Sequence, residues 1–329
     1  MTETVVFLGM GGTIAGKASN AEDNVGYKAG QVAVEQLLES VPGLRAILGD
    51  LQPVSEQVCQ IDSKDLAHAD WLLLTARVLH HLRSPQVRSV IVTHGTDTLE
   101  ETAYWLTRVL PADLLNQKAV VMTCAMRPAS SRTPDGPSNM ADAAAVACSA
   151  GVRGVVVVCA GKVLAAEHVQ KVHPYRVDAF DAGEAGPVAV VEEGRVRQLV
   201  PWPVATTDHV AFDCAPVQAA QLPRVEILIN HAGASGALVR SLFHTPQGDA
   251  PVQGIVVAGT GNGTIHKDME VALREAVSKG IRVVRVSRCP YGQVVSPGNA
   301  TETVFPDWGL SAVKARIALM LDIAASKTR

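Results

Sequence analysis

Three short segments of the chain place hydroxyl and carboxylate side chains where they could act on a small molecule. They read GMGGT at residues 9–13, THGTDT at residues 93–98 and GTGNG at residues 259–263. Two glycines precede Thr13, so its hydroxyl can be exposed and backbone N–H groups can approach a ligand. Thr96 and Asp97 stand where a helix is expected to begin, and could offer a zwitterion a hydroxyl, a carboxylate and helix N-terminal amides.

The first segment comes close to two nucleotide-binding motifs and fails both. A dinucleotide fingerprint, GxGxxG, would need glycine where the chain has Ile14, and no acidic residue stands at the usual distance on a second strand. Residues 11–17 fit GxxxxGK, but Ala18 follows where a P-loop has the Ser or Thr that binds Mg²⁺. A nucleotide is therefore not the expected ligand, and a plain tight turn is the structural alternative.

The second segment has a structural alternative as well. Thr98 and Glu101 have the T-x-x-E spacing of a capping box in front of an apolar helical pattern. Capping would explain Thr98 alone. It gives no reason for Thr96 and Asp97 to stand together at the end of a strand.

Alternating strand and helix patterns must position these segments. Short apolar runs rich in β-branched residues alternate with amphipathic stretches of helical length, which is typical of parallel strands joined by helical crossovers. In the first part of the chain the expected strands are residues 4–8, 51–59, 87–93, 118–123 and 154–159, and the helices include residues 31–41 and 63–82. Residues 161–199 change to shorter runs with Gly and charged turns, which predicts a hairpin. Ligands of such sheets lie beyond the carboxyl ends of the strands.

The length of 329 residues predicts an α/β protein with two domains, a larger N-terminal parallel-sheet domain and a smaller C-terminal one. A Pro-rich stretch without periodicity at residues 200–223 is typical of a connection, and we place the boundary near residue 210, which gives domains 1–210 and 211–329. In the second domain the expected strands are residues 225–230, 254–258 and 282–286, and the expected helices are residues 235–243, 267–279 and 311–324.

Composition limits the classes of partner. The formal net charge is −3, the pI is near 6.4 and no long run of Lys or Arg occurs, so no nucleic-acid partner is expected. The N-terminus resembles neither a signal nor a transit peptide, and no stretch is long and apolar enough to span a membrane. The six cysteines lack metal-binding spacing. We expect a cytoplasmic protein with reduced thiols, a small-molecule substrate and no membrane partner.

Two blocks of sequence carry a more specific signal. Residues 11–16 read GGTIAG and residues 94–103 read HGTDTLEETA, and both resemble the signature blocks of bacterial-type L-asparaginases. The resemblance continues in order through MRP at residues 126–128, DGP at residues 135–137, Asn139, Lys171 and GNG at residues 261–263. It covers most of the chain and identifies it as a member of the asparaginase/glutaminase family.

The resemblance implies an assembly and a first catalytic group. Members are homotetramers built as a dimer of dimers, in which a neighbouring subunit closes each active site. Thr13 matches the family's nucleophile, and Tyr27 matches a tyrosine on a mobile lid that contacts it. The polar residues between them suit such a lid.

The resemblance also implies a second catalytic group and a substrate pocket. Thr96, Asp97 and Lys171 match the second group, and the first two also bind substrate. Ser63 matches the residue that holds the substrate's α-carboxylate, and Asn262 matches one that reaches the partner's site. By themselves, Ser63 could be a helix N-cap, Lys171 a solvated surface lysine and Asn262 a turn residue.

Two positions depart from the family pattern. Lys64 stands where many members have Gln or Glu near the substrate's ammonium, so affinity or side-chain preference can differ. Residues 290–310 are shorter than the usual segment, and Glu302 is the candidate for the glutamate that supports the lid tyrosine. The chain has no cysteine between Cys59 and Cys124, where secreted members often carry a disulfide, which favours a cytoplasmic location.

The resemblance implies hydrolysis of L-asparagine to L-aspartate and ammonia through a threonine acyl-enzyme, with L-glutamine left open as a second substrate. A threonine hydroxyl is a weak nucleophile, so the reaction needs a base and an oxyanion site, but neither a metal nor an organic cofactor. Three alternatives to an asparaginase stay open at this point: a nucleotide-using enzyme, the asparaginase-like subunit of a tRNA-dependent amidotransferase, and a binding or sensing protein without activity.

Overall fold

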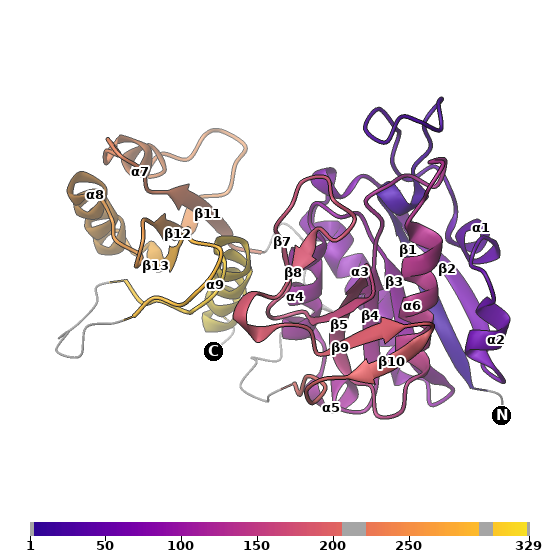
Figure 1. The fold of residues 1–329 in the computed structure, drawn as a ribbon. Coiled ribbons are helices and arrows are strands. Elements are labelled where there is room, and N and C mark those ends of the chain that lie inside the picture. Colours follow the sequence, from indigo (N-terminus) through magenta and orange to yellow (C-terminus); the bar gives the residue numbers. More distant parts are fainter. Residues whose placement is uncertain (1–2, 206–221, 296–304, 328–329) are drawn as a thin grey trace. The chain divides into compact units, whose positions relative to one another are not determined.

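The computed structural model of the chain describes residues 3–205, 222–295 and 305–327. The chain divides into two units, residues 1–217 and 218–329, and each is described by itself (Figure 1). The predicted boundary near residue 210 lies outside the described residues, as does Glu302.

An eight-stranded mixed sheet organises the first unit, in the order β10-β9-β6-β5-β4-β3-β1-β2. The strands are β1 Thr4–Gly11, β2 Gln52–Ile61, β3 Val87–Thr93, β4 Ala119–Thr123, β5 Gly154–Cys159, β6 Lys162–Ala165, β9 Ala189–Glu192 and β10 Arg195–Gln198. Strands β1 to β5 pair in parallel, and β6, β9 and β10 continue the sheet in antiparallel pairing. The predicted α/β class is confirmed, and the predicted hairpin contains β9 and β10.

Helices cover both faces of this sheet. They are α1 Val34–Glu39, α2 Leu44–Leu48, α3 His68–Arg83, α4 Leu99–Val109, α5 Ala112–Leu115 and α6 Gly136–Cys148. Helix α6 packs on β3, β4 and β5 and contacts α1 and α2, whereas α3 and α4 contact each other and pack on β3 and β5 respectively. The helix predicted over residues 63–82 begins only at His68, because Ser63–Asp65 form a separate 3₁₀ turn, η2.

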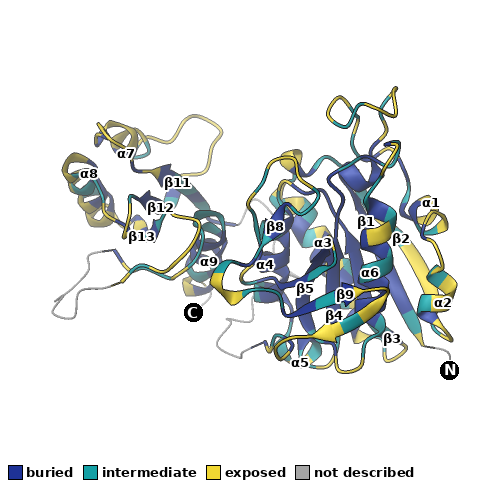
Figure 2. Cartoon of the chain, viewed as in Figure 1, coloured by how far each residue is buried: buried dark blue, intermediate teal, exposed yellow. Residues whose placement is uncertain are grey.

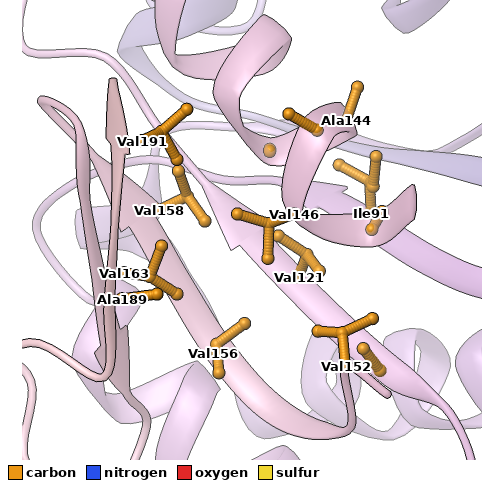
Figure 3. Close-up of a cluster of buried hydrophobic side chains, with 14 of the residues drawn as sticks. Ile91, Val121, Ala144, Val146, Val152, Val156, Val158, Val163, Ala189 and Val191 are labelled. Carbon is orange, nitrogen blue, oxygen red and sulfur yellow. The ribbon is translucent and has the colours of Figure 1, made fainter. Parts of the chain in front are cut away.

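The core explains why the strands read as continuous apolar runs. Ile91, Val121, Val156 and Val158 point from three strands toward Ala144 and Val146 of α6 (Figure 3). The intervening residues, such as Val157, are also fully buried on the opposite face, as the dark strands of Figure 2 show. Strands that are buried on both faces need apolar residues at every position. Alanines on α6 let the helix approach the valines closely, and each buried valine contributes roughly 1.5–3 kcal/mol.

A two-stranded antiparallel pair outside the main sheet carries Lys171. It consists of β7 Gln170–Lys171 and β8 Phe180–Asp181. Phe180 is buried, which anchors this short pair to the unit.

The second unit is a smaller α/β structure with a parallel sheet in the order β11-β12-β13. Its elements are β11 Arg224–Ile229, α7 Ala237–Ser241, β12 Val252–Gly259, α8 Lys267–Ser278, β13 Arg282–Ser287 and α9 Ala312–Ser326. Side chains of α7 and α8 pack with Ile255 and Val257 of β12, whereas α9 packs against Gly254 on the other face. No helix in the described parts of either unit is long and apolar enough to cross a membrane.

Candidate active site

The strand order brings the two threonine segments together. Strand β1 lies between β2 and β3, and Gly9 pairs with Thr93, so both segments leave the same edge of the sheet. The chain passes from β1 to β2 on one side and then crosses over to β3 on the other side of β1. Ligands of α/β sheets bind at such a change of direction, beyond the carboxyl ends of the strands. A Cβ at Gly12, where φ is +80°, would overlap Gly95, and a Cβ at Gly95 would overlap the Ser63 hydroxyl. Three separate segments therefore meet here through glycine.

Thr13 forms the first group of the site with Tyr27. The Thr13 side chain is buried, and its Oγ1 lies 2.6 Å from the Tyr27 hydroxyl. Burial raises the pKa of the Tyr27 phenol, the hydrogen bond with Thr13 opposes this, and the charges of Asp62 and Asp97 raise the pKa further. The phenol is therefore neutral at neutral pH and can donate or accept a proton without storing a negative charge.

Residues 17–28 form the loop that carries Tyr27, which is the segment predicted to be a lid. Lys17 and Lys28 exchange backbone hydrogen bonds of 3.0 and 2.8 Å, which close the base of the loop. Within it, Asp23 Oδ1 accepts from the N–H groups of Val25 and Gly26, and these bonds lower the pKa of Asp23. The turn before Tyr27 is thus fixed locally by a side chain.

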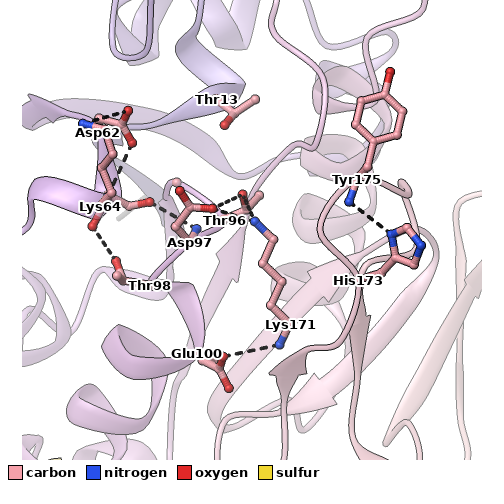
Figure 4. Close-up of polar contacts among 12 residues, drawn as sticks. Thr13, Asp62, Lys64, Thr96, Asp97, Thr98, Glu100, Lys171, His173 and Tyr175 are labelled. Atoms are coloured by element: carbon pink, nitrogen blue, oxygen red, sulfur yellow. Dashed lines mark hydrogen bonds and ion pairs between the residues drawn. The ribbon is translucent and has the colours of Figure 1, made fainter. Parts of the chain in front are cut away.

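Thr96, Asp97 and Lys171 form the second group (Figure 4). Lys171 Nζ donates to Thr96 Oγ1 at 2.9 Å and lies 2.6 Å from Asp97 Oδ1. Its side chain is only 16% exposed, so the alternative of a solvated surface lysine is wrong. The backbone N–H of Lys171 points to Glu100 Oε1 at 3.5 Å, in the first turn of α4. Sequence reasoning missed Glu100, although it lies within the HGTDTLEETA block.

Ser63 connects this group to η2. Its hydroxyl accepts from the Asp97 N–H at 3.2 Å, and its carbonyl accepts from Thr98 Oγ1 at 2.9 Å. Thr98 occupies the N-cap position of α4 as the pattern predicted, but its hydroxyl makes no capping bond and donates to the Ser63 carbonyl instead. Ser63 is not an N-cap either, since Asp62 occupies that position of η2.

A buried chain of hydrogen bonds supports the THGTDT segment at residues 93–98. Trp71 Nε1 donates to Thr102 Oγ1 at 2.9 Å, and the Thr102 hydroxyl lies 3.0 Å from His94 Nε2. His94 Nδ1 must donate to the Gly95 carbonyl at 2.7 Å, because a carbonyl only accepts, so Nε2 of the neutral ring accepts from Thr102. Complete burial lowers the pKa of His94 to about 4, so the ring is neutral and its tautomer is fixed.

Lys64 lies beside the site without joining either group. Its ammonium pairs with Asp65 and lies 3.5 Å from Asp62 Oδ2, and its side chain is largely exposed. The hydrogen bond to Asp65 is the main cause that raises the pKa of Lys64. Asp62, which sequence reasoning also missed, therefore acts on two groups, since it pairs with this cation and its charge raises the pKa of Tyr27.

Asn262 belongs to the second unit, where its contacts are local. Its amide donates to the Val295 carbonyl at 2.8 Å, and its oxygen accepts from the Val295 N–H at 2.7 Å. The Asn262 side chain therefore fixes the position of the main chain at Val295. The structure thus brings together six of the seven predicted residues within the first unit, namely Thr13, Tyr27, Ser63, Thr96, Asp97 and Lys171.

The arrangement has the parts of a hydroxyl-based catalyst: two threonine hydroxyls, a phenol and an ion pair. In the described parts of the chain, no group of three or more His, Cys, Asp or Glu side chains is placed to hold a metal ion. The model of the N-terminal domain of asparaginases matches residues 4–202, and that of the C-terminal domain of glutaminases and asparaginases matches residues 224–329.

Full-length relatives agree with these models. L-asparaginase 2 of Escherichia coli is 34% identical over 98% of this chain and 89% of its own length. The glutaminase-asparaginase of Pseudomonas fluorescens is 34% identical over 99% of this chain and 87% of its own length. The crystal structure of a probable cytoplasmic L-asparaginase from Campylobacter jejuni is 32% identical with a TM-score of 0.84, over 99% and 97% of the two chains. The chain belongs to the asparaginase family of amidohydrolases.

Proposed function

We propose that the chain hydrolyses L-asparagine to L-aspartate and ammonia through a threonine acyl-enzyme. The observation that carries this proposal is the pair of threonine hydroxyls on adjacent strand ends, one 2.6 Å from Tyr27 and the other 2.9 Å from Lys171. Each hydroxyl has a partner that can take or return a proton, which is what a weak alcohol nucleophile needs.

The first half of the proposed reaction forms an ester. Thr13 Oγ1 attacks the side-chain amide carbon and gives up its proton, with Tyr27 as the nearest relay. Backbone N–H groups and the Thr96 hydroxyl stabilise the oxyanion. The amide nitrogen takes a proton and leaves as ammonia, and the β-aspartyl group is then bonded to Thr13.

The second half returns the enzyme to its starting state. A water molecule attacks the ester carbon, its proton passes through the neighbouring groups to Thr13 Oγ1, and the bond between that oxygen and the carbon breaks to release aspartate. Lys171, held between Thr96 and Asp97, is the candidate for proton transfer to and from Thr96. Ser63 and Asp97 would hold the α-carboxylate and the ammonium of the substrate.

The proposal includes an assembly and a compartment. A homotetramer built as a dimer of dimers would let Asn262 of a neighbouring subunit approach this site, and analytical ultracentrifugation tests the tetramer. A cytoplasmic location is supported by the five cysteines of the described residues, which are all free. One relative is named periplasmic, so fractionation of the producing cells decides the compartment.

The test is ammonia release from L-asparagine and L-glutamine by the wild type and by Thr13→Ala, with rapid sampling for an acyl-enzyme burst. We expect asparagine turnover and a burst in the wild type and neither in the variant. The glutamine rate then sets the selectivity, because one methylene in a pocket is worth only about 1–3 kcal/mol. A folded wild type that hydrolyses neither amide would favour a binding protein.

A further inference from the structure

The lid rests on a second loop of the first unit, residues 128–133, which follow β4. The Ala18 N–H donates to Ser130 Oγ at 2.8 Å in a half-buried position. The Arg132 N–H donates to the Ala21 carbonyl at 3.1 Å. The Arg132 guanidinium lies 2.5 Å from a carboxylate oxygen of Glu22. Three contacts of different kinds therefore join the two loops.

These contacts are mechanically connected to Tyr27. The reciprocal bonds between Lys17 and Lys28 tie the start of the lid to its end. The Tyr27 ring lies against Gly16, where a Cβ would come within 2.7 Å of ring carbon Cδ2. A displacement of the lid at Ala18 would therefore move the Tyr27 hydroxyl away from Thr13.

We propose that Ser130 and Arg132 are positioning residues that latch the lid and so keep the Tyr27 hydroxyl on Thr13. Both side chains act on the lid at a distance from Thr13, Ser130 through the backbone of Ala18 and Arg132 through the side chain of Glu22. The kinetic consequence rests on the proposed function, whereas closure of the lid can be measured without it.

The chemistry of the latch suits a lid that must open. The side chains of Arg132 and Glu22 are 72% and 61% exposed, and an ion pair of this kind is weak and is screened by salt. The half-buried bond to Ser130 adds a contact that salt does not screen. Such a latch favours closure without preventing the exchange of substrate and product.

The experiment compares hydrogen exchange of residues 17–28 and kcat for L-asparagine in Arg132→Glu, in the charge-swapped double variant Glu22→Arg/Arg132→Glu, and in Ser130→Ala. Arg197→Glu is the matched control, because Arg197 also forms an exposed pair, with Glu192. We expect Arg132→Glu and Ser130→Ala to speed exchange and lower kcat by about two- to five-fold at low salt. The double variant should recover both quantities, and the control should change neither.

Unchanged exchange in Arg132→Glu, or no recovery in the double variant, would overturn the latch. Faster exchange with an unchanged kcat would show that the contacts close the lid without positioning Tyr27, which also overturns the inference. An inactive wild type would remove the proposed function, and hydrogen exchange would then decide on the latch alone.

Discussion

The two hydroxyl groups of the site are supported by different kinds of structure. Thr13 meets Tyr27, a neutral phenol on a loop whose contacts are partly exposed. Thr96 meets Lys171, a charged group held by Asp97 above a loop that rests on buried His94. The comparison teaches that the Thr13 group depends on a loop with partly exposed contacts, whereas the Thr96 group depends on an ion pair and a buried support.

This difference has a chemical meaning. A phenol with a raised pKa can pass a proton on, but it does not keep a negative charge at neutral pH. An ammonium next to a carboxylate and a hydroxyl can stabilise a charge that develops during the reaction. In the proposed function, the lid on the side of Thr13 would move to admit the substrate.

Removal of Lys171 should give the largest effect, because it deletes the charged half of the comparison. We expect Lys171→Met to lower kcat by about 10²–10⁴-fold, the range for a positioned proton-transfer group. Steady-state kinetics measures this, with Lys162→Met as a control of equal charge change. A kcat within a few-fold of wild type would assign the essential proton transfers to Tyr27.

Acid should loosen the support of the second group through His94. Its pKa is about 4 in the folded chain and 6.5 as the ordinary value, so the unfolded chain binds the proton first. Stability is therefore complete above pH 6.5 and is lost as the pH falls toward 4, by up to about 3 kcal/mol. Urea unfolding between these pH values measures the loss.

The histidine contribution is isolated by substitution. His94→Asn removes the titrating ring, so its unfolding free energy should fall less steeply with acid than that of the wild type. The exposed His80→Asn should retain the wild-type dependence. Equal slopes for His94→Asn and wild type would mean that other groups cause the acid sensitivity.

Tyr27→Phe should have a smaller effect, since it removes one hydroxyl and keeps the ring against Gly16. We expect kcat to fall by about ten- to a hundred-fold, because Thr13 loses its nearest proton relay. Burial holds the pKa of Tyr27 above its ordinary value of 10.0, so the pH profile between 6 and 9 should keep its shape. A shifted profile would show that the phenol ionises during turnover.

Lys64→Gln should have the smallest effect. The ammonium of Lys64 is exposed and already paired with Asp62 and Asp65, so its influence on a bound substrate is screened. We expect KM for L-asparagine to fall by less than about three-fold, because the substrate's ammonium loses a like charge nearby. A larger fall at low salt would place Lys64 inside the pocket.

The sequence predicted the strands better than the contacts of the site. Residues 87–93 and 154–159 are strands as predicted, because burial on both faces leaves a continuous apolar run. The helix expected to begin at Ser63 begins only at His68, after the separate turn η2, and Thr98 occupies the N-cap position of α4 without a side-chain capping bond. The hydroxyl of Thr98 found a tertiary partner in the Ser63 carbonyl, and local spacing carries no information on such a contact.

Lys171 also shows that local sequence patterns do not predict tertiary contacts. It stands on a two-residue strand without any local pattern, and only the family resemblance predicted its meeting with Thr96. Glu100 and Arg132 were missed because each contacts a segment that is distant in the sequence, Glu100 the backbone of Lys171 and Arg132 the side chain of Glu22.

The contact between Gly12 and Gly95 limits how the site can be redesigned. Neither position tolerates a Cβ, so the spacing of the two reactive loops is set by main chain alone and offers no side chain to vary. A laboratory or natural search for new substrates can therefore change the rim at Lys64 and the lid, but not the separation of the loops. Variation in substrate range should accumulate at the rim, while the chemistry of the amide bond stays the same.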